Sequence, residues 1–247
     1  MAADYGLWFV DKEGKDNRGV IAKAEVTTPS SYTCQASTTR MVPGTEIHVP
    51  SIVWYAFIGM HDSKTPNLKN FEAGIYLDTD KKVYLFHLGE NITGQTAGGW
   101  DAKLISSTPL YGQKINITID VTNANYFKTT ATWSGKEVTL QSAWRNGVSG
   151  YNNGCVFKKE MTLGTNSAIC LNNLWKSPYT GNDRFAKIVD FKMGPVTVYN
   201  SNNQLLETIN ATDNFHVSKY VSCTLPKRPT ITTSNGTNTV SYDLTTP

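Results

Sequence analysis

Apolar and polar residues alternate with a period of two along much of the chain. Residues 71–77 (FEAGIYL) place Glu72 and Tyr76 on one side of an extended backbone and four apolar side chains on the other. A polar turn at 78–82 and a strand-forming segment at 83–88 follow. The pattern therefore predicts a β-hairpin that carries Glu72 and Tyr76 on one face.

The same period recurs in other parts of the sequence. Residues 114–121 (KINITIDV) alternate most clearly, and with 127–133 and 137–141 they predict a three-stranded meander. Further strands are predicted at 31–37, 52–58, 156–163, 186–192, 195–200 and 217–225. Few residues suit a helix, so we expect an all-β protein with very little helix.

The order of these elements indicates one domain. No internal repeat or linker divides the 247 residues, and antiparallel meanders without βαβ units predict a two-sheet antiparallel β-sandwich. We expect this domain to cover residues 1–225. The composition changes after Pro226, and residues 226–247 are predicted to form an extended arm or a mobile tail.

Composition and charge narrow the class of partners. The net charge is only +3 and the basic residues are scattered, which argues against a nucleic-acid partner. No apolar run approaches the ~20 residues that span a bilayer. Few charges and many Asn, Thr, Ser and Tyr residues are typical of extracellular β proteins. The start MAADYG resembles an initiator Met placed before a mature N-terminus from which a signal peptide was removed, so we expect a secreted protein. We also expect a monomer.

The four cysteines lack the spacing of a zinc or redox site, which favours disulfides. Strand phase suggests that Cys34 pairs with Cys223 and that Cys155 pairs with Cys170. The alternative is four free thiols in a cytosolic protein.

Three segments of the middle third resemble a known group of proteins. They are SIVWYAFIG at 51–59, FEAGIY at 71–76 and YGQKINITIDV at 111–121. Their order is similar to that of the concanavalin A-like jelly roll, and within it to the glutamic peptidases. The resemblance implies a jelly-roll sandwich and, for a peptidase, a catalytic Gln and a catalytic Glu.

The chain departs from that pattern at both catalytic positions. Glu72 stands where the resemblance implies the Gln, and the strand ATWSG carries Trp133 where it implies the Glu. A peptidase of this type needs an acid to activate water and an amide to stabilise the oxyanion. The residues at these two positions therefore do not supply the amide and the acid that the resemblance implies.

Other groups suit a carbohydrate ligand. Cleavage of a glycosidic bond needs two carboxylates, and the candidates are Glu72 with Asp120 or Glu160. Flat aromatic rings can stack on sugars; the candidates are Tyr76, Trp54, Trp100, Trp133 and Trp144. Asp78 and Asp80 could bind Ca²⁺, although a structural role in the hairpin turn explains them as well. No other cofactor is indicated.

Together these features predict a secreted protein that binds a polysaccharide or glycoconjugate without cleaving it. The ligand would lie in a groove of the concave sheet that carries Glu72. The alternative is a secreted glycan-cleaving hydrolase or lyase, or a divergent glutamic-type acid peptidase, that uses Glu72.

Overall fold

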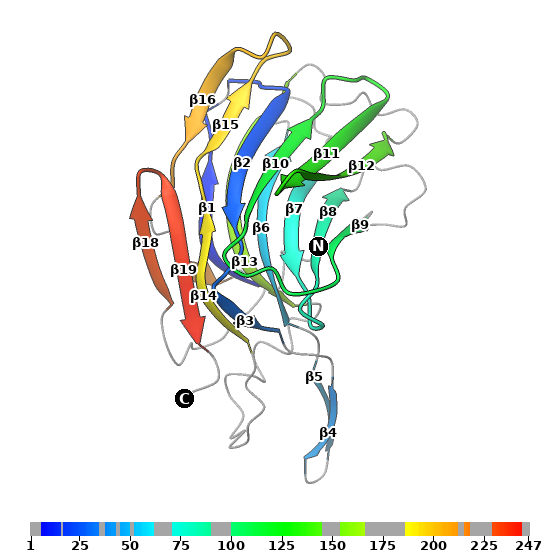
Figure 1. The fold of residues 1–247 in the computed structure, drawn as a ribbon, viewed down its shortest axis with the longest axis vertical. Coiled ribbons are helices and arrows are strands. Elements are labelled where there is room, and N and C mark those ends of the chain that lie inside the picture. Colours follow the sequence, from blue (N-terminus) through cyan, green and yellow to red (C-terminus); the bar gives the residue numbers. More distant parts are fainter. Residues whose placement is uncertain are drawn as a thin grey trace.

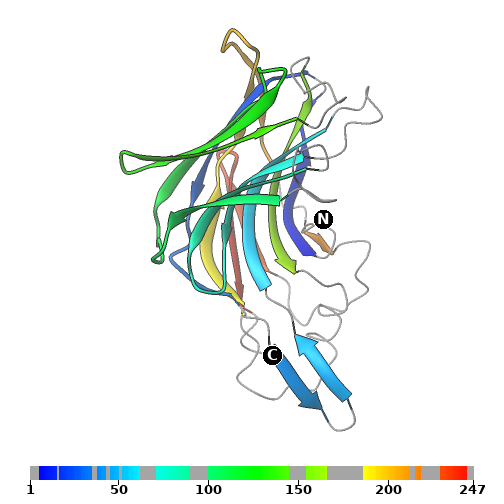
Figure 2. The same cartoon turned by 90° about the vertical axis from the view of Figure 1, so that its right-hand side faces the viewer.

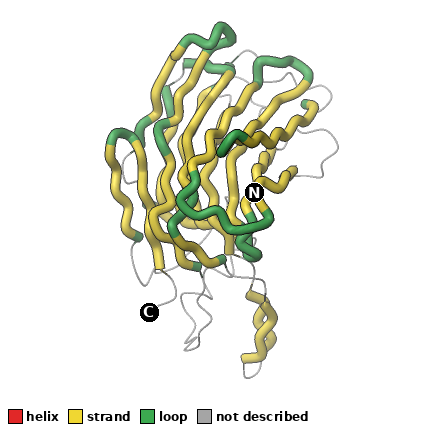
Figure 3. Tube along the Cα trace, in the orientation of Figure 1, coloured by secondary structure: helices red, strands yellow, loops and turns green. Residues whose placement is uncertain are grey.

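The structure is a computed structural model that describes residues 6–15, 17–34, 38–42, 45–49, 52–61, 71–89, 100–144, 154–165, 186–211, 215–217 and 229–243. These residues form strands and connecting loops, with no helix among them (Figure 3). The expectation of an all-β protein is confirmed. No helix in this part of the chain is long and apolar enough to cross a membrane.

The strands follow one another closely along the sequence. Their bounds are β1 (Gly6–Glu13), β2 (Ile21–Thr27), β3 (Ser31–Thr33), β4 (Thr38–Val42), β5 (Thr45–Val49), β6 (Ile52–His61), β7 (Phe71–Leu77), β8 (Val83–Gly89), β9 (Trp100–Ser106), β10 (Lys114–Asp120), β11 (Tyr126–Trp133), β12 (Lys136–Ala143), β13 (Val156–Thr165), β14 (Lys187–Met193), β15 (Val196–Tyr199), β16 (Leu205–Ile209), β17 (His216–Val217), β18 (Thr230–Ser234) and β19 (Thr237–Asp243).

Two antiparallel sheets form a sandwich (Figure 1). One sheet has seven strands in the order β17-β1-β13-β6-β7-β8-β9. The other has ten strands, seven of them in the order β12-β11-β10-β2-β14-β19-β18, with β3, β15 and β16 attached beside this path. The β4–β5 hairpin forms a separate two-stranded sheet that projects from one end of the molecule (Figure 2). The predicted two-sheet sandwich is therefore confirmed.

The core lies between the two sheets because the alternating apolar residues of both point inward. The burial of β2 and β11 alternates at every residue, as expected for half-buried strands. Phe71 of the seven-stranded sheet meets Phe127 of the other edge-to-face, with ring centroids 4.4 Å apart. Such aromatic contacts join the sheets and fix the outward direction of Glu72 and Tyr76 on β7.

The C-terminal strands belong to the sandwich, in contrast to the arm or tail that the composition predicts. β19 pairs with β14 and with β18, and Val240 and Tyr242 are buried in the core. The burial of β19 alternates, and its buried residues are Asn238, Val240 and Tyr242, each two positions after the last.

Both disulfide predictions stay predictions, since Cys170 and Cys223 lie outside the described residues. The Cys34 sulfur donates a hydrogen bond to the Leu77 carbonyl oxygen (3.2 Å). The Cys155 sulfur lies 3.7 Å from the Gly19 carbonyl oxygen.

Candidate functional site

The outer face of the seven-stranded sheet, which points away from the other sheet, carries its own cluster of side chains. Tyr55 and Phe57 of β6 pack there with Phe86 and Leu88 of β8, and Tyr76 packs against them. Tyr76 lies parallel to Tyr84 with ring centroids 4.8 Å apart. Both tyrosines are half-buried, so this face offers aromatic surface beside the acid Glu72.

Glu160 lies on the same face, on β13. It is directly opposite Phe57 of β6 on one side and Asp11 of β1 on the other. Only 8% of the residue is exposed. The indole N–H of Trp8 donates a hydrogen bond to its Oε1 atom at 3.3 Å. A carboxyl group is thus shielded from most of the solvent and held by a residue of the neighbouring strand.

Gly59 on β6 provides the space between the two acids. Gly59 is opposite Glu72 of β7, and a Cβ atom added at Gly59 would lie 2.3 Å from Oε2 of Glu160. The carboxyl group of Glu160 therefore reaches from β13 over Gly59, the residue directly opposite Glu72. A glycine inside a strand often marks such a close approach.

The electrostatic environment of Glu160 favours its protonated form. Burial, followed by the negative charges of Glu72 and Asp11, raises the pKa of Glu160 to about 8. The charge of Lys158 and the hydrogen bond from Trp8 oppose this effect. Two interacting carboxyl groups, one of them kept neutral, are the arrangement that acid–base catalysis uses.

The structure thus brings together Glu72 and Glu160 and separates both from Asp120. Asp120 lies on the outer face of the ten-stranded sheet, because Ile117 and Ile119 of the same strand point into the core. Its Oδ1 atom accepts hydrogen bonds from the backbone N–H and the hydroxyl of Thr122. Asp120 therefore stabilises a turn and is too remote to act with Glu72.

Trp133 also lies on the ten-stranded sheet, at the end of β11. The resemblance placed the missing catalytic acid there, but the acid beside Glu72 is Glu160 of β13. Trp133 is therefore not beside Glu72, and the match of these positions to the family pattern stays a prediction. The site pairs two acids where the resemblance implies an amide and an acid.

The tryptophans proposed for ligand stacking are mostly core residues. Trp54 is fully buried and donates its ring N–H to the Thr33 carbonyl oxygen. Trp144 is buried against Phe127, and Trp133 is 8% exposed. The ring faces of Trp54 and Trp144 are taken up by packing, whereas Trp133 also lines a groove on the ten-stranded sheet. The side chain of Trp100 lies outside the described part of the chain.

Asp78 and Asp80 serve the hairpin turn. Oδ1 of Asp78 accepts hydrogen bonds from the backbone N–H groups of Asp80 and Lys82, and Asp80 forms an ion pair with Lys82 at 3.1 Å. Within the described ranges, no group of three or more His, Cys, Asp or Glu residues is arranged to hold a metal ion.

Sequence reasoning missed three residues of this site, namely Trp8, Asp11 and Gly59. The glycine within an otherwise apolar strand was the one local signal. Trp8 and Asp11 come from β1, which pairs with β13. Trp8 and its hydrogen-bond partner Glu160 are 152 positions apart in the sequence, so no local pattern links them.

No protein-family model matches the chain, and no curated protein matches it. Several solved structures are similar in fold. Scytalido-glutamic peptidase with a transition state analog inhibitor has a TM-score of 0.48 and 14% identity, and the match covers 96% of this chain and 98% of that one. SCP-B, a member of the Eqolisin family of peptidases, has a TM-score of 0.44 and 11% identity over 97% and 98%.

Two further similar structures are viral proteins. Tailspike protein 2 of an Escherichia coli O157:H7 bacteriophage has a TM-score of 0.40 and 13% identity over 82% of this chain and 25% of that one. An alginate lyase from Chlorella virus has a TM-score of 0.31 and 10% identity over 62% and 73%. All these TM-scores are below 0.5, so the likenesses assign no function, and the concanavalin A-like superfamily stays a prediction.

Proposed function

We propose that the protein is a hydrolase of extracellular polymers in which Glu160 and Glu72 act as an acid–base pair. The observation that carries the proposal is the position of Glu160, buried beneath Trp8 and turned over Gly59 toward Glu72. We favour cleavage over the predicted binding without cleavage, because a purely adhesive surface gains nothing from a buried, protonated acid.

The two acids would have different roles in cleavage of a glycosidic bond. Glu160, whose pKa is raised, donates its proton to the oxygen of the leaving sugar as the C–O bond breaks. Glu72 accepts a proton from a water molecule, and the water oxygen forms the new bond to the anomeric carbon. The protons then return to their starting positions through solvent, so that one water is consumed for each bond.

The proposed step also predicts a stereochemical outcome. Glu72 and Glu160 come from the strands on either side of β6, and the carboxyl group of Glu160 lies over Gly59, which is directly opposite Glu72. A single displacement by a water molecule that Glu72 activates inverts the configuration at the anomeric carbon. We therefore propose inversion.

Polysaccharide is the first candidate substrate. The Tyr76–Tyr84 pair lies on the same face as Glu72 and exposes part of its stacked rings. Aromatic rings of this kind suit the C–H faces of sugars.

A peptide is the second candidate. Two carboxyl groups that share protons can also activate water toward an amide, as in aspartic peptidases. The raised pKa of Glu160 supports this function equally well. The described part of the site contains no amide side chain that could stabilise an oxyanion, which argues against a peptide substrate.

Product analysis tests the proposal. The protein is incubated with plant, fungal and bacterial polysaccharides and with a denatured protein, at acidic and neutral pH, and the soluble products are examined by mass spectrometry. New oligosaccharides that are absent with Glu160→Gln and with Glu72→Gln are expected. Asp120→Asn is the matched control, because Asp120 lies on the other sheet and should be dispensable. Release of peptides would identify the second candidate, and release of nothing would contradict both.

A further inference from the structure

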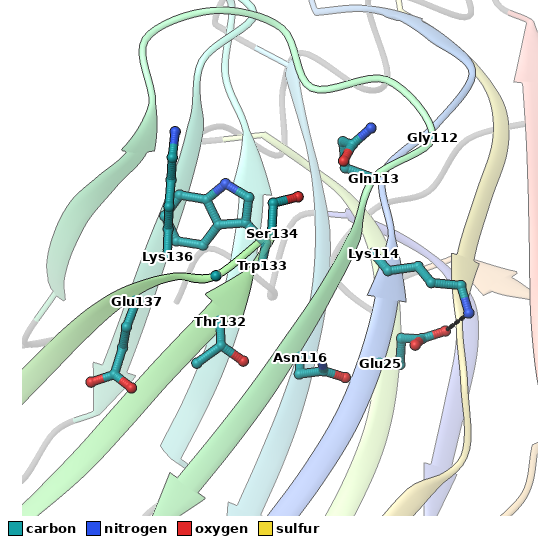
Figure 4. A pocket seen from close by; sticks show the side chains of 11 residues that line it. Glu25, Gly112, Gln113, Lys114, Asn116, Thr132, Trp133, Ser134, Lys136 and Glu137 are labelled. Atoms are coloured by element: carbon teal, nitrogen blue, oxygen red, sulfur yellow. Dashed lines mark ion pairs between the residues drawn. The ribbon is translucent and has the colours of Figure 1, made fainter.

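The ten-stranded sheet carries a polar groove on its outer face, opposite the acid pair. The groove has a volume of about 730 Å³, within the usual range for small-molecule sites. It lies over β2, β10, β11 and β12 near the β11–β12 turn (Figure 4). None of its residues belongs to the site of Glu72 and Glu160.

Four polar side chains form the floor of this groove in one continuous row. Glu25 of β2 is directly opposite Asn116 of β10, Asn116 is opposite Thr132 of β11, and Thr132 is opposite Glu137 of β12. Each strand thus contributes one side chain at the same level of the sheet. Since neighbouring strands are about 4.8 Å apart, the row is about 14 Å long, which suits a short oligosaccharide that lies across the strands.

The rim of the groove is polar as well. Gln113 stands on one side, and the hydroxyl of Ser134 points across the groove from the other side (Figure 4). Ser134 has a φ of 45° and Gly135 a φ of 74° in the β11–β12 turn. Asn or Asp is the usual first residue of such a turn, and a serine in the left-handed region is strained. The turn nevertheless holds the Ser134 hydroxyl over the groove.

The charges at the groove cancel. Lys114 forms an ion pair with Glu25 at 2.8 Å, and Lys136 adjoins Glu137. Two lysines and two glutamates leave no net charge to attract an acidic polymer. The two carboxylates of the row accept hydrogen bonds, and its amide and hydroxyl both donate and accept them. Trp133, which also lines the groove, adds apolar surface that suits the C–H face of a sugar.

We propose that this groove binds a neutral oligosaccharide, or a short stretch of a neutral polysaccharide, across the row from Glu25 to Glu137. The hydroxyl groups of such a ligand both donate and accept hydrogen bonds, as the row requires. Asn116 and Thr132 at the centre contact the ligand, and Gln113 and Ser134 contact it from the rim. The groove is independent of the acid pair and would remain a binding site if the protein cleaved nothing.

Calorimetric titration tests this proposal in a Glu160→Gln background, in which a bound saccharide would not be cleaved. The probes are neutral cello-, xylo-, manno- and chito-oligosaccharides, with oligogalacturonate and oligoalginate as acidic probes. Asn116→Ala and Thr132→Val should each weaken binding of a neutral probe by about three- to tenfold, the effect of one hydrogen bond. Thr118→Val is the matched control, because Thr118 faces the same side of β10 outside the groove and should leave binding unchanged.

The possible results separate the groove from the acid pair. Weaker binding of a neutral probe in both groove variants, with normal binding in Thr118→Val, would support the proposal. Binding that depends on Glu72 and not on Asn116, preference for the acidic probes, or no binding of any saccharide would each overturn it. Circular dichroism of every variant establishes that the fold is retained, and cleavage by Asn116→Ala in the wild-type background reports on the acid pair separately.

Discussion

The ammonium group of Lys159 donates a 2.6 Å hydrogen bond to Oδ1 of Asn238, deep between the two sheets. It also donates to the carbonyl oxygens of Met193 (3.0 Å) and Gly236 (2.8 Å). Burial lowers the pKa of Lys159, whereas three acceptors match the three N–H groups of the charged form. Lys159 precedes Glu160 on β13, so this contact ties the strand of the acid to β14 and to the β18–β19 hairpin.

Lys159→Met should therefore destabilise the protein by about 2 to 4 kcal/mol, because it leaves three buried acceptors without their donor. Urea denaturation measures the change. Lys158→Met is the matched control: its ion pair with Glu13 at 3.7 Å is near the surface, so about 1 kcal/mol or less should be lost. Equal effects of the two variants would contradict a structural role for the buried ammonium group.

Glu160→Gln should stabilise the protein at neutral pH while it abolishes cleavage. The folded-state pKa of Glu160 is raised above that of the unfolded chain, so the folded protein holds this proton more tightly. Its stability consequently falls as pH rises from about 4.5 to about 8. The free energy of unfolding of Glu160→Gln should exceed that of the parent only slightly below pH 4.5 and by about 2 to 4 kcal/mol at pH 8. Denaturation at several pH values tests this, and a gain that does not change with pH would refute it.

His87 should produce a stability loss in acid. The ring is fully buried between the sheets, and Nε2 is 2.9 Å from the Ser142 hydroxyl. Burial lowers the pKa of His87 to about 4, although Asp101 opposes the effect. The folded protein favours the neutral ring, so stability from this group is lost as pH falls from 6.5 through 4.

His87→Leu should remove that acid-dependent loss, which we expect to be about 2 to 3 kcal/mol. The measurement is thermal unfolding between pH 7 and pH 3.5, compared with the parent. An identical acid slope in the variant would assign the loss to other groups. Glu160 changes stability in the opposite direction with pH, so it does not imitate this effect.

Gly59→Ala should impair cleavage much more than it impairs folding. The new methyl group would lie 2.3 Å from Oε2 of Glu160 and must displace that carboxyl group. A misplacement of about 1 Å can cost on the order of 100-fold in rate, and overpacking costs about 1 to 3 kcal/mol in stability. Activity and denaturation assays are compared with Gly194→Ala, whose Cβ would meet no atom closer than 3.4 Å. Unchanged activity in Gly59→Ala would remove Glu160 from the proposed site.

Particular strands show how far the sequence alone was sufficient. The segment 71–77 was predicted with its bounds and with the outward direction of Glu72, because its period of two is uninterrupted. The meander β10–β11–β12 was also predicted, since its short turns connect neighbouring strands. β1, β2 and β19 were not predicted, although each is part of a sheet. The polar composition of the last of them led to the expectation of a tail.

The candidate acids show where sequence reasoning ended. Asp120 and Glu160 were equally plausible partners for Glu72, since both lie on predicted strands. Sheet membership decides between them: β10 belongs to the ten-stranded sheet, and β13 lies next to β6 in the other. Strand order depends on pairings between residues far apart in the chain, and no local pattern contains that information.

The sequence by itself determined that the chain forms antiparallel strands, which of their faces are apolar, and that Glu72 points away from the core, because alternation depends on neighbouring residues alone. The tertiary structure decided which acid meets Glu72, which tryptophans are buried and where the polar groove lies. The physical reason is that the site residues come from four different strands, namely Trp8 from β1, Gly59 from β6, Glu72 from β7 and Glu160 from β13. The hydrogen-bonded registers that bring them together form only when the whole sheet assembles.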